Sequence, residues 1–158
     1  MSRQVGVALL SFAHSHQQAW GRTIAAREDA RVVAVWDENE ARGKAAAASL
    51  GVPFVADLDA VLARDDVDAV TICAENAEHA PLAVRAAGAG KHIMMQKPMA
   101  DSLAAADRTL EAVRSAGVTY MQAYNLRFDP LHEHVKELVD EGAVGRVHTV
   151  RRRHSHHF

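Results

Sequence analysis

Short apolar runs rich in β-branched residues alternate along this chain with longer, alanine-rich segments whose apolar positions recur at helical spacing. The runs are apolar at nearly every position rather than at every second one. Strands of that kind are typical of a parallel sheet that helices cover on both faces. The alternation predicts strands over residues 5–10, 31–37, 69–73, 92–95 and 119–124, and helices over residues 17–26, 40–50, 58–64, 77–87 and 102–116.

Glycines stand where predicted helices return to the next strand, at Gly51, Gly90 and Gly117. Strand–helix–strand crossovers are right-handed, and a succession of them builds one open sheet. The predicted fold class is therefore α/β, a doubly wound parallel sheet over residues 1–124. Such sheets bind ligands at the carboxyl ends of their strands, so functional residues are expected directly after each strand.

The pattern changes after this sheet. A turn is followed by apolar positions at helical spacing, which predict an amphipathic helix ending near Gly142. Alternation from Gly145 onward then predicts the first strand of a second, incomplete α/β domain over residues 125–158. The alternation continues through Arg151–Phe158 and favours native sequence there over a purification tag. The unpaired edge of such a strand favours a homo-oligomer.

The charge balance excludes several classes of partner. The chain carries 18 basic and 20 acidic residues, for a net charge of −2. No overall positive field results, so neither nucleic acid nor an anionic membrane surface is expected as a partner. The apolar run Val5–Leu10 is far shorter than the roughly 20 residues that span a bilayer. The single Cys73 allows neither an intrachain disulfide nor a cysteine-based zinc site, which favours a reducing cytoplasm.

An acidic residue, Asp37, ends the second predicted strand. At that position in a dinucleotide-binding sheet, a carboxylate accepts hydrogen bonds from the hydroxyls of the adenosine ribose. The 2′-phosphate of NADP would bring negative charge against it, and Arg42 would offset that repulsion only in part. Asp37 therefore predicts a Rossmann-type NAD(P)-binding domain that prefers NAD, with a solvated turn aspartate as the alternative.

The turn after the first strand lacks the G-x-G-x-x-G sequence that usually holds the pyrophosphate. It contains Ser11, Phe12, Ala13 and His14 instead. Phosphate oxygens can still be bound by the N-terminus of the following helix and by serine hydroxyls, so these four residues are candidate cofactor contacts. His14 and His16, one residue apart in a loop, are no specific zinc signal, and no metal is expected.

Polar residues also follow the strands that end at Cys73 and Met95. Asn76 is a candidate for either a cofactor contact or the N-cap of the next helix. Lys97 lies between a buried strand and Pro98, whose ring fixes the backbone, so its ammonium group is predicted to point toward the site. The candidate cofactor contacts at this part of the edge are Ala74, Glu75, Asn76, His79, Gln96 and Lys97.

An ordered set of segments spans nearly the whole chain: V-V-A-V-W-D, G-V-P-F-V-A-D-L-D-A-V-L, V-D-A-V-T-I, N-A-E-H-A-P-L-A, A-G-K-H-I-M-M-Q-K-P-M-A, N-L-R-F-D-P and E-G-A-V-G-R-V. In this order they resemble the glucose-fructose oxidoreductase and inositol dehydrogenase family (Gfo/Idh/MocA) of nicotinamide-dependent sugar and cyclitol oxidoreductases. The resemblance implies an N-terminal Rossmann domain, a following open-faced α/β sheet domain, and substrate bound between them. It also implies that Lys97, the lysine of the family's E-K-P motif, is a catalytic residue, and that Asn76 and Asp37 occupy family site positions.

The chain departs from the family pattern at several of these positions. The family's three glycine positions hold Leu9, Ser11 and His14. Gln96 replaces the glutamate of E-K-P, and Glu75 replaces the proline that usually precedes the asparagine. The resemblance places the family's catalytic histidine and aspartate in the second domain, of which this chain holds only the beginning.

The function expected from these residues and from the resemblance is hydride transfer between NAD, or less favourably NADP, and a secondary alcohol of a sugar or cyclitol. Lys97 would orient the substrate hydroxyl and stabilise negative charge that develops on its oxygen. The principal base is expected outside this chain. The alternatives are a non-catalytic nucleotide-binding or regulatory module and a truncated inactive product, so whether the chain is itself an enzyme stays open.

Overall fold

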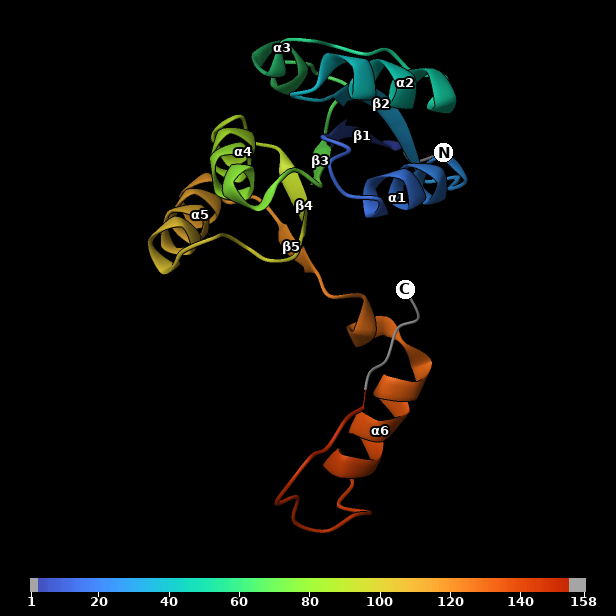
Figure 1. Cartoon of the computed structure of the whole chain (residues 1–158), viewed down its shortest axis with the longest axis vertical. Coiled ribbons are helices and arrows are strands. Elements are labelled where there is room, and N and C mark those ends of the chain that lie inside the picture. The colour runs from blue at the N-terminus through green and yellow to red at the C-terminus, as the bar shows by residue number, and fades with distance from the viewer. Residues whose placement is uncertain (1–2, 154–158) are drawn as a thin grey trace. The chain divides into compact units, whose positions relative to one another are not determined.

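The structure is a computed structural model and describes residues 3–153. Its contacts divide the chain into two compact units, residues 1–123 and 124–158. Figure 1 shows the first unit as a sheet with helices packed against its two faces. None of the helices within residues 3–153 is long and apolar enough to cross a bilayer.

The sheet of the first unit has five strands, and every neighbouring pair is parallel. The order is β2-β1-β3-β4-β5, which confirms the predicted doubly wound α/β fold. Leu10 lies opposite both Trp36 and Ile72, so the carboxyl ends of β1, β2 and β3 are level with one another. The strands are β1 (Val5–Leu10), β2 (Ala30–Trp36), β3 (Ala69–Ile72), β4 (His92–Gln96) and β5 (Tyr120–Ala123).

One short segment extends the sheet beyond β2. The amide of Val35 donates to the carbonyl of Pro53 at 3.0 Å, and the amide of Val55 donates to the carbonyl of Val35 at 2.9 Å. Phe54 thereby forms a single parallel bridge with Val35. With this segment counted as a rudimentary strand, the order matches the six-stranded Rossmann arrangement.

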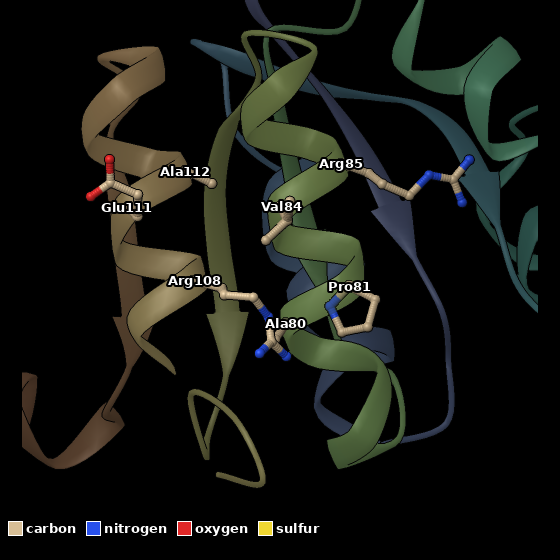
Figure 2. Close-up of a pocket in the computed structure, with 7 residues that line it drawn as sticks. All are labelled: Ala80, Pro81, Val84, Arg85, Arg108, Glu111 and Ala112. Atoms are coloured by element: carbon tan, nitrogen blue, oxygen red, sulfur yellow. The ribbon is translucent and has the colours of Figure 1, made fainter. Parts of the chain in front are cut away.

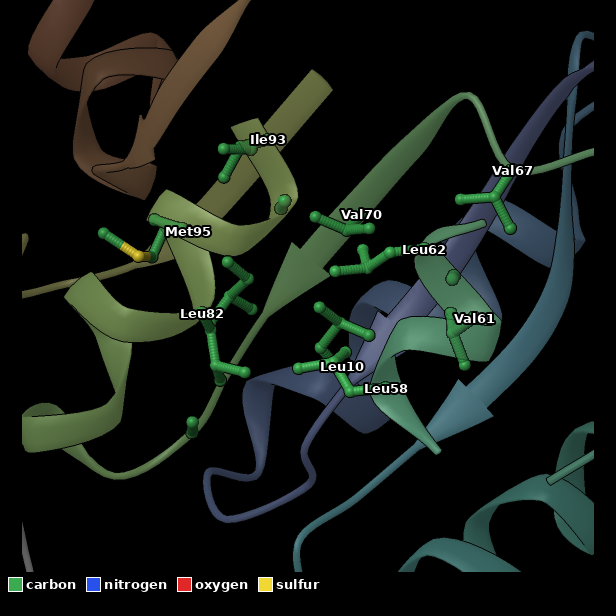
Figure 3. Packing of buried hydrophobic residues seen from close by; sticks show 14 of the residues in the cluster. Leu10, Leu58, Val61, Leu62, Val67, Val70, Leu82, Ile93 and Met95 are labelled. Atoms are coloured by element: carbon green, nitrogen blue, oxygen red, sulfur yellow. The ribbon is translucent and has the colours of Figure 1, made fainter. Parts of the chain in front are cut away.

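Helices cover both faces of the sheet because neighbouring residues of each strand point to opposite sides. Leu9 packs with Val35 and Ala47 on the side of α1 and α2. Leu10 belongs to the larger cluster on the other side, where Figure 3 shows Leu58, Leu62 and Leu82 facing the strands. The helices are α1 (His16–Ala25), α2 (Glu40–Leu50), α3 (Leu58–Leu62), α4 (Asn76–Gly88) and α5 (Leu103–Ala116).

Local sequence fixes where several helices begin and end. The side chain of Asn39 accepts a hydrogen bond from the Arg42 amide at the start of α2. Ser102 caps α5 in the same way. Gly51 and Gly117 end α2 and α5 in the left-handed conformation, with φ of 68° and 66°, as the glycine positions predict.

The second unit contains a short 3₁₀ helix, η1 (Asn125–Phe128), and the helix α6 (Pro130–Asp140). The predicted helix is confirmed, and Asp129 caps it by accepting hydrogen bonds from two first-turn amides. The strand predicted from Gly145 is not formed within the described residues, which end at Arg153. A strand needs hydrogen bonds from a neighbour, and no strand of this unit is described that could supply them. The rest of the predicted segment, residues 154–158, lies outside the described residues.

Candidate functional site

The candidate residues that follow β1, β2, β3 and β4 all lie at the carboxyl edge of the sheet. Backbone hydrogen bonds join the loops directly. The amide of Ser11 donates to the carbonyl of Trp36 at 2.8 Å, and the amide of His14 donates to the carbonyl of Cys73 at 3.1 Å. The sequence-predicted site is therefore one continuous edge rather than a set of separate loops.

Ser11 keeps the backbone shape of a glycine turn without the glycine. Its φ is 64°, and among the described residues it is the one non-glycine with a positive φ. This left-handed conformation costs an L-residue about 1–2 kcal/mol. In the family resemblance, Ser11 falls at a glycine position of the G-x-G-x-x-G sequence. A serine thus adopts here the left-handed conformation that glycine adopts without strain.

The amides of this turn are largely satisfied within the chain. The Phe12 amide donates to Asp37 Oδ2 at 2.8 Å, and the Ala13 amide donates to Ser11 Oγ at 3.3 Å. The His16 amide donates to His14 Nδ1 at 3.2 Å. Between Ser11 and His16, the amide of Ser15 is the one without a hydrogen-bond acceptor among the described residues. A pyrophosphate at this turn would compete with internal acceptors for most of its amides.

Asp37 is buried and fully engaged. Its side chain has 0% exposure. Oδ2 accepts from the Phe12 amide at 2.8 Å and from Arg42 Nε at 2.9 Å, while Oδ1 accepts from the Asn39 amide at 2.8 Å and from Arg42 Nη2 at 2.8 Å. The hydrogen bond to Asp37 raises the pKa of the Arg42 guanidinium above its ordinary value. Asp37 thus links the turn after β1 to the start of α2.

Glu38 is a second carboxylate at this point, and the sequence reasoning did not single it out. Its side chain is 35% exposed. Oε1 accepts from Ser11 Oγ at 3.0 Å and from Arg42 Nη2 at 2.5 Å. The one available signal in the sequence is its place directly after Asp37, and that place does not say which of two neighbouring carboxylates faces outward.

The residues after β3 have different surroundings. Ala74 is buried, whereas Glu75 and Asn76 are exposed. Asn76 is the first residue of α4, and the capping position belongs to Glu75, which makes no side-chain cap bond. The N-cap interpretation of Asn76 is therefore wrong. Its exposed side-chain amide does not cap the helix. Burial raises the pKa of the Cys73 thiol to about 12, so this cysteine is an inert core residue.

His79 is buried with 0% exposure and joins two loops of the edge. Its Nδ1 lies 2.6 Å from the carbonyl oxygen of Pro98, and its Nε2 lies 3.0 Å from that of Ala74. The first carbonyl follows Lys97, and the second precedes Asn76. Because the imidazole is enclosed, its geometry suits holding the two loops together rather than touching a ligand.

Lys97 is exposed, and no ion pair within residues 3–153 involves it. Its amide donates to Gln96 Oε1 at 2.9 Å, which leaves Gln96 Nε2 to donate to His14 Nδ1 at 3.1 Å and to His16 Nδ1 at 2.5 Å. Both histidines accept at Nδ1, as the neutral Nε2–H tautomer does. Burial, followed by the nearby His16, Lys97 and His79, lowers the pKa of His14 below its ordinary value.

Metal-ligating side chains do not gather here. Within the part of the chain that the structure describes, no three histidine, cysteine, aspartate or glutamate residues lie close enough together to hold a metal ion.

Two surface hollows differ in whether candidate site residues line them. One of about 560 Å³ lies between α4 and α5, where Figure 2 shows Arg108 extending toward Ala80. It involves none of the predicted site residues. Another, of about 380 Å³, touches the turn after β1 and the start of α2, and its lining includes Phe12, His14 and Arg42.

Comparison with known proteins extends this description. Residues 5–124 match the family model described as "Oxidoreductase family, NAD-binding Rossmann fold" (Gfo/Idh/MocA). The chain is 36% identical to the inositol 2-dehydrogenase of Rhizobium meliloti over 82% of its length and 39% of that protein. It is 39% identical to the D-xylose 1-dehydrogenase (NADP(+)) 2 of Haloferax volcanii over 70% of its length and 35% of that protein.

Among solved structures, the WlbA dehydrogenase of Bordetella pertussis, in complex with NADH and UDP-GlcNAcA, is similar with a TM-score of 0.85 and 26% identity. The match covers 92% of this chain and 42% of that one. The chain therefore spans roughly two fifths of the length of the relatives that it matches.

Proposed function

Because the chain belongs to the Gfo/Idh/MocA oxidoreductase family, we propose that residues 1–124 are the cofactor-binding domain of an NAD-dependent dehydrogenase. Its substrate is a secondary alcohol of a sugar or cyclitol. The observation that carries the proposal is the gathering of Glu38, Asn76 and Lys97 at the carboxyl edge of a Rossmann sheet. Relatives named as inositol and xylose dehydrogenases support the substrate class.

The side chains at this edge fit a dinucleotide. Exposed carboxylate oxygen suits ribose hydroxyls, while the Ser15 amide and the N-terminus of α1 suit a phosphate oxygen. A nicotinamide held at this edge would supply the hydride acceptor for oxidation of the hydroxyl-bearing carbon. In this proposal Lys97 orients the substrate hydroxyl with its exposed ammonium group and stabilises the negative charge that develops on the oxygen.

The second unit has a separate place in the proposal. We assign residues 125–158 to the start of a substrate domain, and we place the base that takes the hydroxyl proton outside the described residues. The greater length of the relatives supports both assignments. We also propose a cytoplasmic homo-oligomer.

A non-catalytic nucleotide-binding module is the second candidate. The internally satisfied amides of the Ser11–His14 turn favour it, because they leave few donors for a tightly held pyrophosphate. It shares the cofactor site with the first candidate and lacks the chemistry of Lys97.

Calorimetric titration of the 158-residue chain with NADH and NADPH tests the proposal. We expect NADH to bind more tightly than NADPH, and we expect Lys97→Ala to change the NADH dissociation constant by less than about threefold, because Lys97 is assigned to the substrate oxygen. Absence of binding for both nucleotides would overturn the proposed function. A preference for NADPH would contradict the assignment of NAD.

A further inference from the structure

The end of β2 presents two neighbouring carboxylates with opposite surroundings. Asp37 is enclosed, with 0% side-chain exposure, and Glu38 is 35% exposed. In a Rossmann sheet, the acidic residue at this place receives the adenosine ribose. This inference rests on the proposed function. The contacts of the two side chains show which of them can accept hydrogen bonds from the ribose.

Asp37 has no acceptor capacity left for a ligand. A carboxylate accepts about four hydrogen bonds. Those of Asp37 come from the Phe12 amide, the Asn39 amide and Arg42 through both Nε and Nη2. A ribose hydroxyl would have to displace one of these donors and leave it unpaired in a buried position.

Glu38 has one carboxylate oxygen without a hydrogen-bond partner among the described residues. Its Oε1 is held by Ser11 Oγ at 3.0 Å and by Arg42 Nη2 at 2.5 Å. Its Oε2 has no hydrogen-bond partner among the described residues, and the side chain is partly exposed to solvent. Because Ser11 stands at a glycine position of the pyrophosphate turn, this contact fixes Glu38 beside the expected path of the dinucleotide.

We propose that Glu38, rather than Asp37, accepts the hydroxyls of the adenosine ribose. Asp37 is then a positioning residue that holds the Phe12 amide and the guanidinium of Arg42. The two neighbouring carboxylates divide the tasks that one aspartate performs in the usual arrangement.

The charges of this group also favour a diol over a phosphate. Asp37 and Glu38 each carry one negative charge and Arg42 carries one positive charge, which leaves the group with a formal charge of −1. A 2′-phosphate would meet this excess negative charge. Removing the charge of Glu38 brings the sum to zero and leaves Arg42 Nη2 without the ion pair to Glu38.

Calorimetry on Glu38→Gln with NADH and NADPH tests the inference. We expect the NADH dissociation constant to rise about tenfold, as for loss of a hydrogen bond to a charged group, and the preference for NADH over NADPH to disappear. Glu40→Gln is the matched control. It removes the same charge from the first turn of α2, where Glu40 is exposed and paired with Lys44, and it should leave both constants unchanged.

The outcomes separate the inference from the proposed function. If Glu38→Gln binds both nucleotides as the wild type does, the inference is wrong and the proposed function stands. If a folded Asp37→Asn protein loses NADH binding while Glu38→Gln keeps it, Asp37 is the ribose ligand. If the wild type binds neither nucleotide, the inference and the proposed function fall together.

Discussion

The two halves of the strand-end edge are held by different chemistry. The half after β1 and β2 depends on ionised groups, with Arg42 between Asp37 and Glu38. The half after β3 and β4 depends on a buried imidazole and a buried amide, His79 and Gln96. The first half is therefore set by charge and close helix packing, whereas the second is set by enclosed hydrogen bonds. Different substitutions should therefore disturb each half.

The largest effect is expected in the second half, from His79→Ala. The substitution removes the imidazole that contacts the Ala74 and Pro98 carbonyls, with one N–H donating to one of them, and leaves a cavity, so we expect a loss of about 3–4 kcal/mol in the free energy of unfolding. Urea denaturation followed by circular dichroism measures it. His134→Ala, at an exposed site of α6, is the control and should change stability by less than about 0.5 kcal/mol. A loss below about 1 kcal/mol for His79→Ala would show that this half is not held by the imidazole.

A smaller effect is expected in the first half, from Gly43→Ala. A methyl group on Gly43 would lie 2.4 Å from Phe54 Cε2 and 2.7 Å from Asp37 Cβ, so α2 would have to move away from β2. We expect a loss of about 1–3 kcal/mol by thermal or urea unfolding.

Gly88→Ala gives the matched control for Gly43→Ala. Gly88 is also helical, but a methyl group there would meet nothing within 4 Å. Replacement of a helical glycine by alanine in open space should stabilise the protein by about 0.5–1 kcal/mol. Equal effects of the two substitutions would contradict close packing as the cause.

The smallest effect is expected on the pH dependence of the free energy of unfolding. It arises where the two halves meet, at the hydrogen bond between Gln96 and His14. The pKa of His14 is lowered below its ordinary value of 6.5, chiefly by burial, so the unfolded chain binds the proton more readily than the folded one. The contribution of His14 to stability is therefore present above pH 6.5 and is lost as the pH falls through that value toward the folded-state pKa.

Urea unfolding at a series of pH values measures this contribution. His14→Asn keeps a hydrogen-bond acceptor and removes the titrating ring, so we expect a flatter profile below neutral pH. An unchanged profile would assign the pH dependence to other groups.

The layout of the sheet was predictable from the sequence because a strand buried on both faces is apolar at nearly every position. Neighbouring residues such as Leu9 and Leu10 are both apolar since each faces a different layer of helices. The same reasoning predicted a site at the carboxyl edge, because function in such sheets follows the strand ends.

Finer features of the site were not predictable, because they depend on contacts between distant segments. The division between Asp37 and Glu38 is set by the Phe12 amide and by Arg42, which come from other elements. The burial of His79 depends on the carbonyl of Pro98, nineteen positions further along the chain. The strand predicted from Gly145 failed for the same kind of reason, because alternation specifies a strand only where a neighbour pairs with it.

The left-handed Ser11 affects how this turn responds to substitution. Serine restricts the unfolded chain more than glycine does, which offsets part of its strain in the folded state. Exchange of this serine for glycine would relieve the backbone strain, but it would also remove the hydroxyl that accepts from the Ala13 amide, so the two effects on stability oppose each other. The same exchange would remove the hydroxyl that bonds to Glu38. In the proposed role of Glu38, this hydroxyl therefore couples the conformation of the turn to the carboxylate that receives the ribose.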